Sequence, residues 1–187
     1  MKAKVLETTV TYLVMEARPA HVPPMPSSPR LALMRADKIP LHFYRYLYGT
    51  VGGSWLWVER LELSDQVLAE KVHRDGVEVF VLYANGSPAG YYELDFTDPG
   101  SVRLVYFGLM SEWTGMKIGP WLLGTAVAEA FSRGAAEVLV NTCTMDHPAA
   151  LPLYQRLGFR PIRRENRQLR VPATLKVPGH IAARMPP

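Results

Sequence analysis

The sequence predicts one mixed α/β domain, built on a mostly antiparallel sheet flanked by helices. Its length of 187 residues is typical of a single domain, here taken as residues 1–187. Three strand-like segments follow one another between Val77 and Leu109 with short turns between them. Beyond Lys117 the apolar spacing changes from a strand period to a helix period. Adjacent strands followed by a helix and further strands are typical of this fold class.

Composition narrows the function classes. Apolar residues make up 48% of the chain and charged residues 20%, which is ordinary globular usage and excludes wholesale disorder. The single cysteine, Cys143, excludes a disulfide-stapled scaffold and a cysteine-rich zinc module, so we expect a cytoplasmic protein without a metal. No apolar run approaches the ~20 residues that span a bilayer, so no membrane partner is expected. The net charge of +4 favours anionic ligands only mildly.

The N-terminal third alternates ordered segments and loops. Thr8 to Glu16 is rich in Thr, Val and Tyr and predicts a strand. Residues 18–30 contain five prolines, which predict an extended, exposed loop. Leu41 to Tyr48 is densely aromatic ahead of Gly49, and Asp65 to His73 has the pattern of a short amphipathic helix.

The middle of the chain gives the clearest pattern. Val77 to Ala84 is an apolar run that ends in Asn85-Gly86, the strongest short hairpin signal, and Ala89 to Phe96 is the return strand. After a turn, Val102 to Leu109 predicts a third strand.

The last third alternates helices and strands. Apolar residues from Ile118 onward follow helical spacing until Ser132-Arg133-Gly134 ends the helix. A strand, a short helix closed by Gly158, one or two more strands and a flexible tail are then expected at residues 137–144, 148–157, 159–175 and 179–187.

Gly115-Met116-Lys117-Ile118-Gly119 stands where the long helix begins. Unpaired backbone N–H groups and the helix dipole favour an anion there, so this loop is a candidate phosphate cradle. It lacks the Gly-Lys-Ser/Thr ending of a Walker loop and the spaced glycines of a dinucleotide fingerprint. A plain tight turn is the alternative.

Two segments carry a family resemblance. Gly108-Leu-Met-Ser-Glu-Trp-Thr-Gly-Met-Lys-Ile-Gly119, followed by Leu122-Leu123, and the pattern Ala150-x-x-Leu-Tyr154-x-x-x-Gly158-Phe159 resemble the two central motifs of the GNAT (GCN5-related) N-acetyltransferases. The resemblance covers residues 77–159, which would form the cofactor-binding core. It implies a sheet whose fourth and fifth strands splay apart to admit acetyl-CoA.

The resemblance also implies roles for individual residues. Backbone groups of Phe107 and Leu109 would bind the pantetheine amides like an added strand. Tyr154 would protonate the departing thiolate of coenzyme A as a general acid. The remaining implied coenzyme contacts are the pyrophosphate loop and one residue after the next strand: Thr114, Gly115, Met116, Lys117, Ile118, Gly119 and His147.

The sequence departs from the family in several places. Lys117 stands where relatives have glycine, so it either obstructs the diphosphate or adds charge to it. His147 stands where many relatives have an asparagine that contacts the cofactor; alternatively, Asp146 beside it caps the next helix. Arg103 lies where the family's glutamate base is usual, so Glu93 becomes the candidate general base, with Asp95 or water as alternatives.

The predicted function is transfer of acetyl from acetyl-CoA to a primary amine of a small molecule or peptide, with no metal. Trp55 and Trp57 would share one face and line an acceptor pocket if residues 54–58 are extended. Two rivals remain: a non-catalytic acyl-CoA sensor or regulatory domain, and a nucleic-acid module using the six arginines of residues 156–170. A nucleophilic Cys143–His147 pair is a minor alternative, and a homodimer is left open.

Overall fold

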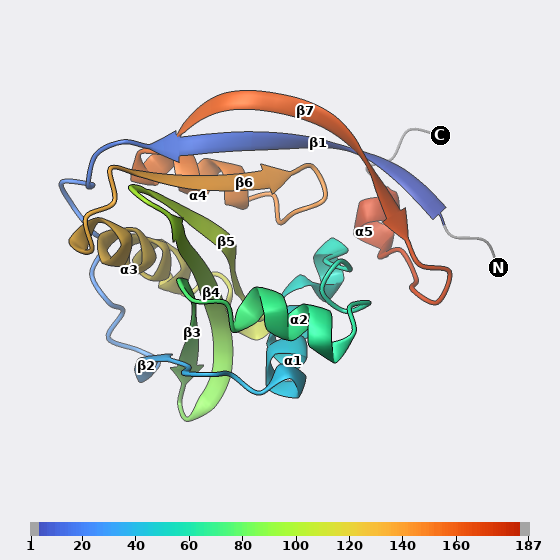
Figure 1. Ribbon diagram of the computed structural model, residues 1–187, viewed down its shortest axis with the longest axis horizontal. Coiled ribbons are helices and arrows are strands. Elements are labelled where there is room, and N and C mark those ends of the chain that lie inside the picture. Colours follow the sequence, from blue (N-terminus) through green and yellow to red (C-terminus); the bar gives the residue numbers. More distant parts are fainter. Residues whose placement is uncertain (1–3, 184–187) are drawn as a thin grey trace.

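The computed structural model describes residues 4–183 and contains one seven-stranded sheet (Figure 1). The strand order is β2-β3-β4-β5-β6-β1-β7. The strands are β1 (Lys4–Met15), β2 (Leu31–Arg35), β3 (Val77–Ala84), β4 (Ser87–Asp98), β5 (Ser101–Leu109), β6 (Glu137–Cys143) and β7 (Arg160–Val171). The helices are α1 (Leu41–Gly52), α2 (Asp65–Val72), α3 (Ile118–Ser132), α4 (Ala150–Leu157) and α5 (Gly179–Ala182), with 3-10 turns η1 (Gly53–Trp55) and η2 (Ser111–Trp113).

The sheet is mixed and mostly antiparallel, as the sequence predicts. Only β5 and β6 pair in parallel among the described strands. A parallel pair needs a long crossover, and α3 supplies it between β5 and β6. The fold class is therefore confirmed.

The N-terminal strand lies inside the sheet. Strand β1 pairs with β6 through residues 10–15 and with β7 through residues 4–14 (Figure 1). The chain then crosses the α3 side of the sheet through residues 16–30, which form no helix or strand, and Val22 packs against α3 at Gly124. The two ends of the chain thus build one half of the sheet together.

Each face of the sheet has its own apolar core. Helices α3 and α4 pack on one face, where Leu122 and Val127 meet Leu94, Leu104 and the other buried side chains of that face. Helices α1 and α2 pack on the opposite face against β3 and β4. No helix within residues 4–183 has the length and apolarity needed to cross a membrane. The two cores hold the central strands between them.

Two elements are absent from the sequence predictions. Leu31–Arg35 forms β2, which pairs antiparallel with β3 directly after the proline-rich segment. The aromatic segment at Leu41 is helix α1, and Tyr44, Leu47, Tyr48 and Val51 share its buried face. That spacing is helical, so the pattern itself could have identified the helix.

Residues 54–58 are not extended, so the predicted alternation of Trp55 and Trp57 is wrong. Trp55 ends the 3-10 turn η1, and Leu56 after it has a left-handed backbone with φ of 59°. A strand cannot continue through such a residue.

The C-terminal segment also differs from its prediction. In place of the expected flexible tail, Gly179–Ala182 forms α5, and Ile181 is fully buried with Leu6, Leu56 and Met145. This small cluster fastens the far ends of β1 and β7 to the η1 segment. Residues 184–187 of the predicted tail lie outside the described residues.

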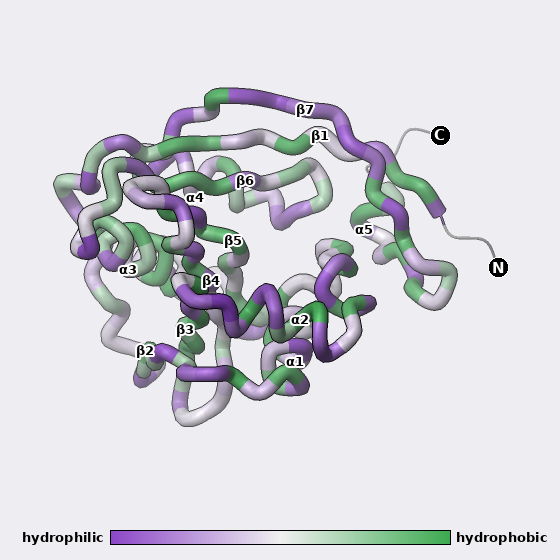
Figure 2. Tube along the Cα trace, viewed as in Figure 1, coloured by the Kyte–Doolittle hydropathy of each residue, from purple (hydrophilic) through white to green (hydrophobic). Residues whose placement is uncertain are grey.

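Strand β7 is a hydrophilic edge (Figure 2). Its arginines are exposed and partly paired: Arg160 with Glu16, and Arg163 and Arg167 with Glu165. Arg163 also lies over the Tyr12 ring, 4.1 Å from its centroid. Charges along an edge strand discourage pairing with other chains, which accounts for this arginine cluster without a nucleic-acid partner.

Gly90→Ala tests the packing of β4 against β5. The added Cβ would meet the carbonyl oxygen of Gly108 and lie 2.9 Å from Leu109 Cδ2. Overpacking of this kind costs about 1–3 kcal/mol, which urea denaturation measures. Gly53→Ala is the control, because that added Cβ has no heavy atom within 4 Å; it should change stability by less than about 0.5 kcal/mol. Equal effects of the two changes would contradict the close approach.

Candidate active site

Strands β5 and β6 separate partway along their length. Their ladder runs only from the Ser101–Glu137 pair to the Leu104–Val140 pair. Beyond it, β5 keeps its pairing with β4 as far as Leu109, while β6 keeps its pairing with β1 as far as Cys143. A wedge therefore opens between Val105–Leu109 and 141–143.

The open edge of β5 presents backbone donors to this wedge. Met110 N donates to Ala89 O of the β4 side, at 2.8 Å. Because successive N–H groups of a strand point to opposite sides, the N–H groups of Leu109 and Phe107 are directed away from β4 and into the wedge. The predicted pantetheine contacts thus lie where an extended ligand can add to the strand.

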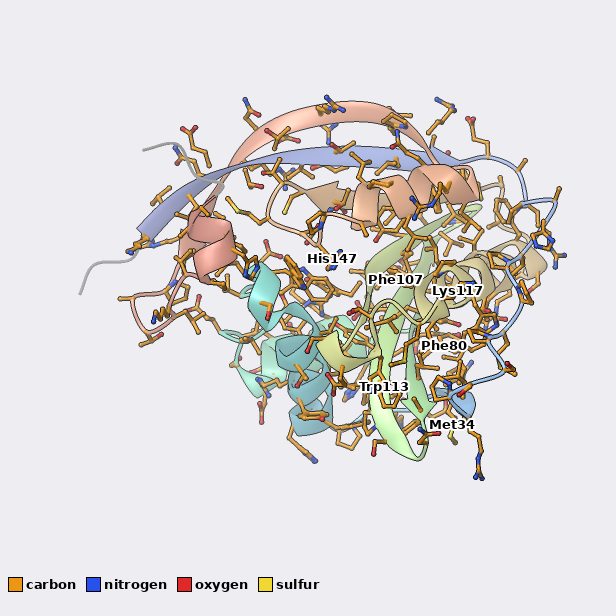
Figure 3. All side chains as sticks on the ribbon, turned by 180° about the vertical axis from the view of Figure 1, so that it is seen from behind. Met34, Phe80, Phe107, Trp113, Lys117 and His147 are labelled. Atoms are coloured by element: carbon orange, nitrogen blue, oxygen red, sulfur yellow. The ribbon has the colours of Figure 1, made fainter. Side chains whose placement is uncertain are left out.

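The start of α3 borders the same wedge (Figure 3). Helix α3 has no side-chain cap, so its first backbone N–H groups are left for a ligand or water. Gly115 has φ of 79°, and a Cβ there would meet no heavy atom within 4 Å. The Thr114 hydroxyl donates a hydrogen bond to Ser111 O at 2.7 Å. The loop therefore forms a helix N-terminus suited to an anion.

Lys117 occupies a backbone conformation that favours glycine. Its φ is 60°, in the left-handed region, at the residue that caps α3. This explains why glycine is usual at the position: an L side chain there costs of order 1–3 kcal/mol. The exposed ammonium can reach an anion at the helix start, which would offset that strain on binding.

Tyr154 lies on α4 at the α3 side of the wedge. Its ring centroid is 6.3 Å from that of Phe107 and 5.8 Å from that of Phe159. Within residues 4–183, no hydrogen-bond partner of its hydroxyl is found, although only 5% of the residue is exposed. Burial, and then the charge of Asp146, raise the pKa of Tyr154. The phenol therefore stays protonated at neutral pH and holds a proton to donate.

The loop between β6 and α4 is organised by Asp146, which does not cap α4. The capping residue is Ala149, without a side-chain hydrogen bond. Asp146 instead accepts from Thr142 Oγ1 at 2.7 Å, from Cys143 N at 2.8 Å and from Trp57 Nε1 at 3.1 Å. The predicted cap is wrong, and the carboxylate instead ties Trp57 to the loop.

His147 is exposed beside this carboxylate. Its Nδ1 accepts from Ala149 N at 3.0 Å, which places the proton of the neutral ring on Nε2. The centroid of the His147 ring lies 4.9 Å from that of Trp55.

Cys143 is a poor candidate nucleophile. Burial raises the pKa of its thiol, which disfavours the reactive thiolate.

Glu93 lies in a buried polar cluster on the α1 side of the sheet. Only 1% of the residue is exposed. Arg60 Nη2 donates to its Oε1 at 3.0 Å, and the Tyr44 hydroxyl donates to its Oε2 at 2.7 Å. The Arg60 guanidinium also lies over the Tyr106 ring, 5.2 Å from its centroid. Both oxygens of the candidate base are therefore engaged.

The two candidate carboxylates differ in basicity. Burial raises the pKa of Glu93, although Arg60 and Tyr44 oppose the shift. Asp95 is partly buried, but hydrogen bonds from Thr97 and the Arg74 ion pair outweigh desolvation and lower its pKa. Of the two, Glu93 is the better proton acceptor.

A pocket of about 470 Å³ opens beside Glu93. It lies between α2, the C-terminal end of β4 and the N-terminal half of β5. Arg103 and Val105 of β5 line it, together with Leu139 of β6. Arg103 therefore lies in this pocket, where the family resemblance would place a carboxylate. No group of three or more His, Cys, Asp or Glu side chains in the described chain is arranged to hold a metal ion.

Several residues of this site are missing from the sequence predictions. Arg60 is the main one, since it lies in a loop and belongs to no local motif. Tyr44 and Tyr48 could have been assigned to a buried helix face by their spacing, but their hydroxyl partners depend on the tertiary fold. Trp57 and Asp146 come together only because η1 folds back over β5.

The sequence also matches a known protein family. The sequence profile of the acetyltransferase (GNAT) family matches residues 43–159. That range includes the open edge of β5, the start of α3 and Tyr154. No curated protein sequence matches the chain.

Solved structures share the fold. A GCN5-related N-acetyltransferase from Kribbella flavida has a TM-score of 0.58 at 17% identity, over 94% of this chain and 60% of its own. An IAA acetyltransferase from Bacillus cereus has a TM-score of 0.54 at 25% identity, over 72% and 79%. An aminoglycoside N-acetyltransferase in complex with CoA has a TM-score of 0.54 at 19% identity, over 74% and 94%. The chain thus spans less than two thirds of the Kribbella protein.

Arg60→Met tests the buried ion pair. It should cost about 3–5 kcal/mol, because Glu93 is left charged and unpaired in the core. Adding Glu93→Leu should recover part of that loss in urea denaturation, since an apolar pair needs no desolvated charge. Additive costs in the double variant would contradict the pairing.

The same variant has a defined pH dependence. Without Arg60, only the Tyr44 hydrogen bond still opposes desolvation, so the pKa of Glu93 rises further above the unfolded value of ~4.3. The penalty is therefore absent below that pH and grows as the pH rises toward the folded pKa. Arg60→Met should lose more stability at pH 8 than at pH 4.5, relative to the unmodified protein.

Proposed function

The chain belongs to the acetyltransferase (GNAT) family, and on that premise we propose that it transfers an acetyl group from acetyl-CoA directly to a primary amine. The observation that carries the proposal is the wedge between β5 and β6. Beside it lie the N–H groups of Phe107 and Leu109, the start of α3 without a side-chain cap, and the Tyr154 hydroxyl, for which the described residues show no hydrogen-bond partner.

The coenzyme would lie along the wedge. Its pantetheine amides would pair with Phe107 and Leu109 as an added strand does. Its diphosphate would meet the N–H groups of residues 115–119, and Lys117 would supply a counter-charge. His147 lies across the wedge on the loop after β6 and would contact the coenzyme from that side.

The chemical step would be direct. The amine nitrogen attacks the thioester carbonyl carbon, whose oxygen is polarised by Leu109 N–H, and the C–S bond breaks. Tyr154 donates its proton to the departing sulfur. The amine proton passes to Glu93 through a water in the adjoining pocket, because Glu93 is buried; each carboxylate oxygen accepts from that water with its second lone pair, beside the bonds from Tyr44 and Arg60. Proximity supplies much of the rate, since the reaction becomes effectively unimolecular.

A coenzyme-binding domain without turnover is the second candidate. Arg103 favours it, because a cation lies where relatives use a carboxylate. Release of free thiol from acetyl-CoA with a panel of primary amines separates the two. Thiol release with formation of the N-acetyl product supports the transferase. Coenzyme binding by calorimetry without turnover on any amine supports the second candidate.

Gly119→Asp tests the phosphate cradle. A Cβ at Gly119 meets only Leu153 and Leu109 side chains at 3.7 and 3.9 Å, so the fold has room for it. The new carboxylate would repel a diphosphate at close range, so the Kd for acetyl-CoA should rise at least about tenfold. Ser132→Asp adds the same charge at the exposed far end of α3 and should leave the Kd unchanged. Unchanged affinity in Gly119→Asp ends this assignment.

Tyr154→Phe tests the general acid. The change removes only the hydroxyl, for which the described chain shows no partner, so stability and coenzyme affinity should persist. The kcat should fall by roughly 10²-fold, as expected for loss of an acid. Full activity would assign Tyr154 to packing against Phe107 alone.

Glu93→Gln tests the base through the pH profile. Because burial raises the pKa of Glu93, the acidic limb of kcat/KM should lie above the ordinary carboxyl range of about 4. The variant should lose that limb, and its deficit should shrink at high pH, where more amine arrives deprotonated. A uniform loss at every pH would instead indicate that Glu93 only positions Arg60.

A further inference from the structure

The pocket beside Glu93 has a charge pattern that the transfer reaction itself does not require. Its walls carry four cations and four anions, from α2, the sheet and the loops on either side of α2: Arg60, Lys71, Arg74, Arg103, Glu70, Glu93, Asp95 and Asp98. Four of these residues form two ion pairs with one another, Arg60 with Glu93 and Arg74 with Asp95. The remaining charges are available to a ligand.

The available cations, Arg103 of β5 and Lys71 of α2, are exposed side chains on the wall of the pocket. Within residues 4–183, the side chains of Arg103 and Lys71 form no hydrogen bond or ion pair, although the charge of Asp95 attracts Arg103. The Arg60 side chain is nine-tenths buried, and its Nη1 has no hydrogen-bond partner in the described chain. A buried guanidinium donor without a partner is costly unless something binds it. The anions that remain, Glu70 and Asp98, are exposed too, and Glu70 already accepts a hydrogen bond from Gln66 Nε2 at 3.4 Å.

The register of the sheet spaces these groups along the pocket. Glu93 is opposite Tyr106, near the wedge, and Asp95 is opposite Arg103, farther from it. Two residues of a strand span about 7 Å. If the amine of a ligand lies near Glu93, a group several bonds from that nitrogen can contact Arg103. The carboxylate of a simple α-amino acid is too close to its amine to reach Arg103.

We propose that this pocket holds the acceptor, and that the acceptor is an amine bearing a separate anionic group, a carboxylate or a phosphate, several bonds from the reacting nitrogen. The inference rests on the proposed transfer reaction. Arg103 and Lys71 bind the anion, and Glu93 lies at the amine end. Arg103 then selects the substrate, and the carboxylate that serves as the base is Glu93 on the neighbouring strand β4.

A matched acceptor series tests the proposal. The probes are 6-aminohexanoate, 5-aminopentyl phosphate and 1-aminohexane, which have similar length and differ in the distal group. At least one anionic probe should exceed 1-aminohexane in kcat/KM by about tenfold or more, as a charge-assisted contact gives. The better anion identifies carboxylate or phosphate. Equal kcat/KM for all three probes overturns the proposal.

Charge reversal locates the contact. Arg103→Glu should abolish the preference for the anionic probe and favour 1,6-diaminohexane, with acetyl-CoA affinity unchanged as evidence of folding. Arg163→Gln, on the remote strand β7, should keep the original preference. An unchanged preference in Arg103→Glu overturns the proposal.

Direct binding keeps the two proposals separable. If no probe is acetylated, the transfer reaction fails, and calorimetry of the same probes with the coenzyme-loaded protein tests the pocket alone. Binding of an anionic probe that is lost in Arg103→Glu supports the pocket. Absence of binding by every anionic probe overturns it.

Discussion

The separation of β5 from β6 is the feature on which the rest of the site depends. If the ladder between β5 and β6 continued to Leu109, strand pairing would use the N–H and C=O groups of β5 that now face the wedge. The strands can part because each keeps another partner: β4 holds β5, and β1 holds β6. The N-terminal strand therefore contributes to the site without touching it, since it fixes the far wall of the wedge.

Because side chains alternate along a strand, the two faces of β5 contact different parts of the protein. Phe107 and Leu109 meet α3 and α4, where Tyr154 lies. Tyr106 and Gly108 face α1 and η1, and a Cβ at Gly108 would collide with Val51. Coenzyme and acceptor would thus approach the same strand from opposite sides. The buried Arg60–Glu93 pair holds the η1 side in place, so acceptor recognition and the proposed proton transfer share one cluster.

Local patterns predicted the elements well, and tertiary contacts decided the rest. Val77–Ala84 and the helix from Ile118 follow from hairpin and periodicity signals, and the motifs around Gly119 and Tyr154 indicated the fold. The partner of Glu93 could not be predicted, because Arg60 reaches it from a loop 33 positions away in sequence. The place of β1 inside the sheet likewise depends on contacts with β6 and β7, which no local pattern encodes.

A crystal structure of the protein soaked with acetyl-CoA tests most directly whether the wedge is the coenzyme site. We expect electron density for pantetheine beside Phe107 and Leu109, diphosphate at residues 115–119, and the sulfur within hydrogen-bond reach of the Tyr154 hydroxyl. Coenzyme density elsewhere on the molecule, with the wedge filled only by solvent, would contradict this assignment.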